Sequence, residues 1–118
     1  MKYIALIYTN PETDERPNTP EFGKMMAGYD ACNKAYAEAG VYVGGDALQP
    51  PMTATTVRVR GGKTETMDGP FAETKEQLGG FYILDCKDLD EAVKFAAMIP
   101  HAASGAVEVR PLMIFDAG

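Results

Sequence analysis

The residues with the greatest capacity for chemistry lie in one acidic segment, residues 68–76, which reads Asp-Gly-Pro-Phe-Ala-Glu-Thr-Lys-Glu. Two carboxylates held close together raise the pKa of one of them toward neutrality, whereas a nearby ammonium keeps a carboxylate ionised. Asp68 is therefore a candidate general base, Glu73 a candidate for adjusting its pKa, and Lys75 a candidate for orienting a polar substrate. A charged turn, capped by Asp68 and solvated elsewhere, explains the same residues without catalysis.

A second group of side chains is a candidate for binding a ligand. Tyr29 lies in a predicted helix, and Asp46 follows two glycines at the end of a predicted strand. Paired glycines there suit either a β-bulge or the close approach of a ligand to the backbone, although a turn carboxylate is the simpler reading. Arg110 would meet an anionic ligand, as would Arg58 and Arg60, but the last two alternate along a strand and fit a solvated face.

His101 is the single histidine of the chain, and its imidazole is suited to shuttling protons near neutral pH. It stands between Pro100 and an alanine, in the connection from a helix to a strand, so we expect an exposed loop residue. Cys32 and Cys86 are 54 positions apart without metal-ligand spacing around them, and we expect two reduced, partly buried thiols. No phosphate-binding or dinucleotide-binding loop occurs, so no metal and no cofactor is expected.

The elements that position these residues follow from local patterns. Thr19, Pro20 and Glu21 form a helix start, and Gly40 is a typical helix end. Asp88 begins a capping box for a shorter amphipathic helix that runs to Pro100. Strands are predicted at residues 2–8, 41–45, 55–60, 63–67 and 79–86, the third and fourth forming a hairpin about two glycines. Residues 107–109 and 112–115 form one last strand, in which Pro111 indicates an edge or a bulge.

The order of these elements is β-α-β, a β-hairpin, then β-α-β. Two helices packed on one antiparallel sheet make an α+β sandwich of ferredoxin-like type. The first, fifth and last strands are apolar on both faces, whereas the helices cover one face only. About 400 Å² or more of contiguous apolar surface would then be left in water, which is unusual for a soluble monomer. We therefore expect a homodimer that packs sheet against sheet; a monomer covered by its own loops is the alternative.

Composition limits the class of protein. The 118 residues fit one domain, residues 1–118, with 46% hydrophobic and 24% charged residues. The formal net charge is −6 and no run of lysine or arginine occurs, which argues against nucleic acid or an anionic membrane as the main partner. The apolar start of the chain is too short for a signal sequence, and no stretch approaches the roughly 20 apolar residues of a membrane span. We expect a cytoplasmic protein.

Residues 68–81 resemble the signature of the YCII-related (DGPF domain) family, and residues 1–8, 39–50 and 105–111 resemble other parts of it. The resemblance implies a dimeric α/β-barrel, and Asp68 and Glu73 match the motif of the DGPF branch. Many members of the wider family carry a histidine on the first helix that faces an aspartate. This chain has no histidine there, and its polar candidates on that helix are Tyr29, Asp30 and Asn33.

Two hypotheses for the function follow. The first is a module that binds a small molecule or acts as an accessory or regulatory protein, in which the acidic segment is structural. The second is an enzyme without a cofactor, a lyase, isomerase or hydrolase-like catalyst, that uses Asp68 as general base on a small organic compound in a pocket between the first helix and the sheet.

Overall fold

The structure is a computed structural model that describes residues 1–12, 14 and 16–115 of the chain. Its elements, in chain order, are β1 (Lys2–Thr9), α1 (Pro20–Ala39), β2 (Tyr42–Ala47), the short 3-10 helix η1 (Pro51–Thr53), β3 (Thr55–Arg60), β4 (Lys63–Asp68), β5 (Gln77–Asp85), α2 (Leu89–Ala96), α3 (His101–Ser104) and β6 (Ala106–Pro111).

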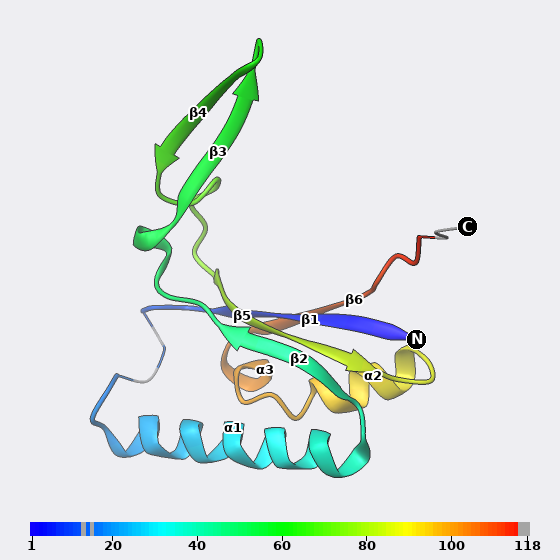
Figure 1. Ribbon diagram of the computed structural model, residues 1–118. Helices are drawn as coiled ribbons and strands as arrows, with labels where there is room; N and C mark the ends of the chain where they lie inside the picture. Colours follow the sequence, from blue (N-terminus) through cyan, green and yellow to red (C-terminus); the bar gives the residue numbers. More distant parts are fainter. Residues whose placement is uncertain (13, 15, 116–118) are drawn as a thin grey trace.

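Four strands form one antiparallel sheet in the order β2-β5-β1-β6, and all three α-helices lie on one side of it (Figure 1). The prediction of a mixed α+β fold with an antiparallel sheet is confirmed. The described chain forms an open sheet and not a closed barrel. The face without helices is called the outer face below; it carries Ile4, Leu6, Phe81 and Ile83, which pair directly across β1 and β5.

Helix α1 begins and ends as predicted. The Thr19 hydroxyl accepts a hydrogen bond from the Phe22 N–H at 3.2 Å, and Pro20 is at the first turn, where its missing N–H costs nothing. Gly40 ends the helix with φ of +71°, a left-handed conformation that glycine adopts without strain. The side of α1 that packs on the sheet buries Cys32 and Tyr36.

Helix α2 has the predicted cap but is shorter than predicted. Asp88 accepts a hydrogen bond from the Glu91 N–H at 2.9 Å. The helix ends at Ala96 and not at Pro100, and a separate turn of helix, α3, follows that proline. Proline cannot continue a helix because it has no N–H, but it starts one well, so the chain restarts as α3. None of the helices in the described residues has both the length and the apolar content to span a bilayer.

The core lies between the helices and the inner face of the sheet. Tyr3, Ala5 and Ile7 alternate along β1 and are buried there, and Leu84 of β5 faces Tyr3 across the pair. Tyr36 of α1 is fully buried. Its hydroxyl donates a hydrogen bond to the Phe95 carbonyl at 2.5 Å, which satisfies a polar group in an apolar surrounding.

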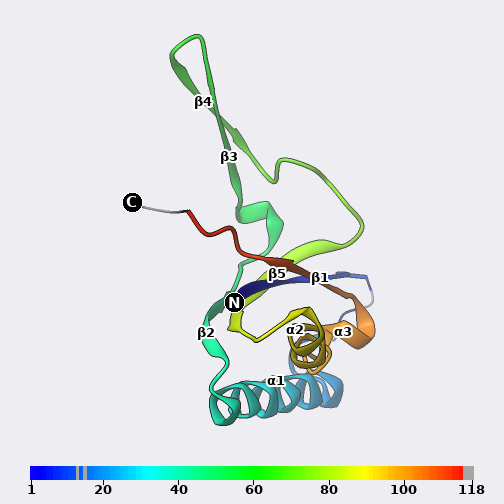
Figure 2. The ribbon, with the colours of Figure 1, turned by 90° about the vertical axis from the view of Figure 1, so that its right-hand side faces the viewer.

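Two predictions about the strands need correction. The hairpin forms at the predicted residues, with φ of +57° and +76° at Gly61 and Gly62, but β3 and β4 pair only with each other and stand away from the four-stranded sheet (Figures 1 and 2). The last strand ends at Pro111, and residues 112–115 are outside it. The Leu112 N–H bonds to the Lys2 carbonyl, after which β1 offers no further partner because it begins at Lys2.

Candidate functional site

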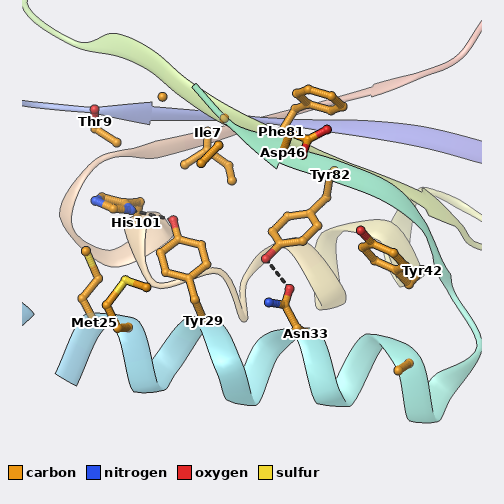
Figure 3. A pocket seen from close by; sticks show the side chains of 16 residues that line it. Ile7, Thr9, Met25, Tyr29, Asn33, Tyr42, Asp46, Phe81, Tyr82 and His101 are labelled. Carbon is orange, nitrogen blue, oxygen red and sulfur yellow. Dashed lines mark hydrogen bonds between the residues drawn. The ribbon is translucent and has the colours of Figure 1, made fainter. Parts of the chain in front are cut away.

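A cleft of about 710 Å³ lies between α1 and the sheet (Figure 3). One wall is α1, which contributes Met25, Met26, Tyr29 and Asn33. The opposite wall comes from β1, β2 and β5, and α3 closes one end with His101. Its lining is mainly apolar with a few polar groups, which is the usual composition of a site for a small molecule.

Tyr29 and His101 form the central polar contact of the cleft. The Tyr29 hydroxyl lies 2.6 Å from Nδ1 of His101, and the His101 residue is only 7% exposed (Figure 3). A neutral imidazole that carries its proton on Nε2 accepts the Tyr29 proton at Nδ1; a doubly protonated imidazole donates to the Tyr29 oxygen instead. The pair therefore has two hydrogen-bonding states that differ by one proton.

Asp14 faces the other nitrogen of the same imidazole. Its Oδ1 lies 3.7 Å from Nε2 of His101, and the Asp14 side chain is 22% exposed. A backbone hydrogen bond from Asp14 N–H to the Asn10 carbonyl, at 2.8 Å, holds this residue in the loop after β1. Tyr29, His101 and Asp14 thus form a continuous series, called the Tyr29–His101–Asp14 relay below, in which a carboxylate lies where it stabilises an imidazolium.

A second hydrogen-bonded pair lies one helical turn along α1. The Tyr82 hydroxyl donates to Oδ1 of Asn33 at 2.5 Å. Asn33 follows Tyr29 by four positions, so both side chains lie on the same face of the helix, toward the cleft. The Asn33 amide N–H groups remain as donors for a bound molecule.

Burial changes the acidity of the phenols in this region. It is the main cause that raises the pKa of Tyr82 to about 12, with a smaller contribution from the nearby Cys32. Burial also raises the pKa of Tyr29 well above the ordinary value, helped by the proximity of Tyr82 and Cys32. Both phenols are therefore neutral hydrogen-bond donors at physiological pH, and a tyrosinate does not accumulate.

The three residues predicted from the sequence to bind a ligand do not lie together in the structure. Tyr29 lines the cleft, and its role in binding a ligand stays a prediction. Asp46 contributes to the cleft wall, but its side chain and that of Phe81 lie on the opposite side of the sheet from Tyr82 (Figure 3). Arg110 pairs with Glu108 on β6, across from Ile4 on the outer face.

The acidic segment lies elsewhere. Asp68 ends β4, and Glu73 and Lys75 lie in the exposed connection between β4 and β5. None of these three residues lines the cleft in the described part of the chain. Their catalytic role stays a prediction.

The expectation that His101 is an exposed loop residue is wrong. Helix α3 packs against β1 and β6, and this packing buries the imidazole among Tyr29, Asp14 and the strands. Sequence reasoning misses the site because Tyr29 and His101 are 72 positions apart, and no local pattern joins them. The one available signal is that the chain has a single histidine at a helix start after proline.

Groups of three or more histidine, cysteine or acidic side chains suited to a metal ion do not occur among the described residues. Both cysteines are free and buried in the structure, as expected. Burial, as the largest cause, raises the pKa of each thiol.

The fold and the cleft define a small α+β protein with a buried tyrosine–histidine pair in a site of small-molecule size. The model of the YCII-related domain matches residues 1–116, and the chain belongs to that family. A relative from Rhizobium meliloti (strain 1021), the uncharacterized protein R00369, is 41% identical over 120 residues, a match that covers 100% of this chain and 97% of the relative.

A solved structure is also similar in part. It is 5-chloro-2-hydroxyhydroquinone dehydrochlorinase (TftG) from Burkholderia phenoliruptrix AC1100, in complex with 2,5-dihydroxybenzoquinone. The likeness covers 96% of this chain and 94% of that one, with a TM-score of 0.46 and 18% identity. No chemistry is transferred from that enzyme at this level of similarity.

Proposed function

We propose that the cleft binds a small, uncharged organic compound and that the Tyr29–His101–Asp14 relay transfers a proton to and from it. The observation that carries the proposal is His101, a buried imidazole held between a phenol in the cleft and a carboxylate behind it. A lone buried histidine often has a structural role, but its Nδ1 here reaches the cleft through a hydroxyl that lines the wall.

The charge of the lining limits the class of substrate. The described residues that line the cleft include no lysine or arginine. A carboxylate or phosphate entering an apolar cleft needs a cation to offset its lost hydration. A compound with carbonyl or hydroxyl groups needs only a hydrogen-bond donor, which the Asn33 amide supplies, because the Tyr29 hydroxyl already donates to Nδ1 of His101.

The proton transfer is balanced within the relay. The substrate gives a proton to the Tyr29 oxygen while the original Tyr29 proton passes to Nδ1 of His101, and the electron pair stays on the substrate as an enolate. The new imidazolium is stabilised by the Asp14 carboxylate. Reversal at another atom gives an isomer, and loss of a leaving group gives an elimination. Because burial raises the pKa of Tyr29, the two transfers occur together.

Solvent exchange tests this function before the substrate is known. A thermal-shift screen of uncharged carbonyl and hydroxyl compounds identifies ligands, and each is then followed by proton NMR in D₂O for deuterium incorporation. We expect at least one ligand to exchange a carbon-bound proton with enzyme present. H101Q is expected to lower that rate by about a hundredfold or more, the usual contribution of acid–base catalysis.

The matched control is D90N, which neutralises an exposed acid of α2 away from the cleft. It should exchange at the wild-type rate. Binding without exchange by the wild type would support the other hypothesis, a binding module. Normal exchange by H101Q would show that the relay is not the catalytic group.

We also propose that the protein is a homodimer that packs through the outer face, in a two-chain α/β-barrel arrangement. Ile4, Leu6, Phe81 and Ile83 form a contiguous apolar centre that no helix covers. Charged residues lie around it, Asp46 on β2 and the Glu108–Arg110 pair on β6. An apolar centre within a polar rim is the usual anatomy of a protein interface.

A further inference from the structure

The β3–β4 hairpin, called the ribbon below, pairs with no other strand of the described residues and is mostly exposed. All six residues of β4 are exposed, and on β3 only Thr56 is partly covered. The ribbon extends from the side of the sheet opposite the helices (Figures 1 and 2). An isolated two-stranded hairpin is marginally stable at best in water, so a ribbon of this kind needs something packed against it.

The two faces of the ribbon differ. One face, called the valine face, carries Val57, Val59, Thr64 and Thr66, which are uncharged and β-branched, with Thr55 and Asp68 at the base of the ribbon. Val57 and Val59 are 59% and 60% exposed on it. β-branched residues gain most when a neighbouring surface covers them.

The opposite face of the ribbon is charged. It carries Arg58, Glu65, Arg60 and Lys63, with Thr56 and Met67 at its base, and the Arg58 guanidinium lies 4.9 Å from the centre of the Phe71 ring. Four of the six side chains on this face are charged, whereas the valine face carries one charge, Asp68 at its base. The asymmetry points to a ribbon with one docked face and one solvated face.

We propose that the valine face of the ribbon is an arm that packs on a second copy of this chain. The inference rests on the homodimer proposed above and adds the element that makes its interface large enough. The ribbon rises on the same side as the outer face, so a copy seated there lies beside it. A two-fold dimer uses this surface twice, one ribbon on each side.

Dimensions favour this arrangement. Six residues of strand span about 20 Å, whereas packed sheets lie about 10 Å apart, so the ribbon extends past the sheet of a partner seated on the outer face. The shape of the chain agrees: its Cα radius of gyration is 16.5 Å, whereas a compact chain of this length has about 13.5 Å.

The buried interface area distinguishes a dimer that uses the ribbon from a dimer that does not. From strand spacings, the outer face has a footprint of about 300 Å² and the valine face adds about 200 Å². The sheets alone would bury about 600 Å² over both copies, which is the size of a crystal contact. With both ribbons and the partner surface that each one covers, the total is about 1,400 Å², which is within the range of specific interfaces.

Sedimentation equilibrium of the full-length protein tests the arm. The variant V57K/V59K places two charges on the valine face, and M67K places one charge on the other face of the ribbon. We expect a wild-type dimer, a dissociation constant raised about tenfold or more in V57K/V59K, and a change of less than about threefold in M67K. Circular dichroism checks that each variant folds.

A second variant keeps the test decisive if V57K/V59K misfolds. The Gly69 N–H bonds to the Ala54 carbonyl at 2.8 Å, so the two ends of the ribbon are adjacent and a short glycine–serine linker replaces residues 55–68. This variant should also dimerise weakly. If both ribbon variants associate as tightly as the wild type, the ribbon is not part of the interface, although the dimer stands. If the wild type itself is monomeric, both the ribbon contact and the dimer are ruled out. If M67K raises the dissociation constant as much as V57K/V59K does, the valine face is not the face that packs on the partner.

Discussion

At the scale of single residues, position in the fold decides which titratable groups take part in chemistry. His101 is the buried polar residue of the core, and its two ring nitrogens face Tyr29 and Asp14. The histidine comes from α3 and the first helix supplies Tyr29, so the two groups meet only through the packing of these helices.

Substitution of Asp68 tests whether the acidic segment has a structural or catalytic role beside that proposed for the cleft. Its side chain is exposed and makes no hydrogen bond to the described residues. D68A should therefore change the free energy of unfolding by less than about 0.5 kcal/mol, as for an ordinary surface position. Urea denaturation measures this.

The paired measurement for Asp68 is D68N in the NMR exchange assay, where it should keep the wild-type rate. A loss of about 1 kcal/mol or more in D68A would instead show that Asp68 caps the turn. Loss of exchange in D68N with normal folding would restore Asp68 as the general base.

At the scale of elements, the cleft depends on the position of α1. The Thr19 cap fixes where the helix begins, and residues four apart on the helix share the face that packs on the sheet. Tyr29 and Asn33 come from that face, whereas Cys32 and Tyr36 fill the core beside it. Without this cap the helix would still form, but its first turn would be less stable.

T19A should lower the free energy of unfolding by about 1 kcal/mol, because the Phe22 N–H loses its acceptor. T19S, which keeps the hydroxyl, should remain within about 0.5 kcal/mol of the wild type. Thermal or urea unfolding of the two variants checks the pair. Equal stability of T19A and T19S would mean that water satisfies this N–H equally well.

At the scale of the whole molecule, buried phenols link stability to alkaline pH. The folded pKa of Tyr82 is about 12, against an ordinary value of 10.0, and that of Tyr29 is also raised. Below pH 10 both states keep these protons. Above it the unfolded chain loses them first, so the unfolded state becomes favoured.

The free energy of unfolding should therefore fall as pH rises from about 10 to 12. Urea denaturation at each pH measures the fall. Y82F should be less stable at neutral pH because Asn33 loses its partner, but its slope against alkaline pH should be shallower. An identical slope in Y82F would mean that Tyr82 ionises as easily folded as unfolded.

The outer face gives the prediction for assembly. L6K places an ammonium at the centre of that face and should make the protein monomeric at micromolar concentration, because a buried unpaired charge is strongly unfavourable. M52K is the control, since Met52 is 84% exposed in η1 and outside the face. Light scattering distinguishes the species. A dimeric L6K would place the interface on another surface.

Local patterns in the sequence determined the elements. The Thr19 and Asp88 caps, the Gly61–Gly62 turn and the strand at β1 are confirmed because each depends on residues close to one another in sequence. Side chains alternate between the two faces of a strand, so a strand of consecutive apolar residues has apolar side chains on both faces. The uncovered outer face was therefore predictable.

Only the tertiary structure decided which side chains meet. The ribbon stands away from the four-stranded sheet, and the packing of α3 buries His101. Asp14 reaches His101 from the loop after β1, which is distant from α3 in the sequence. These contacts join residues up to 87 positions apart (101 − 14 = 87), and they arise from packing of whole elements rather than from any spacing along the chain. Secondary structure is set by neighbours in sequence, whereas a site between layers is set by how the layers cover one another.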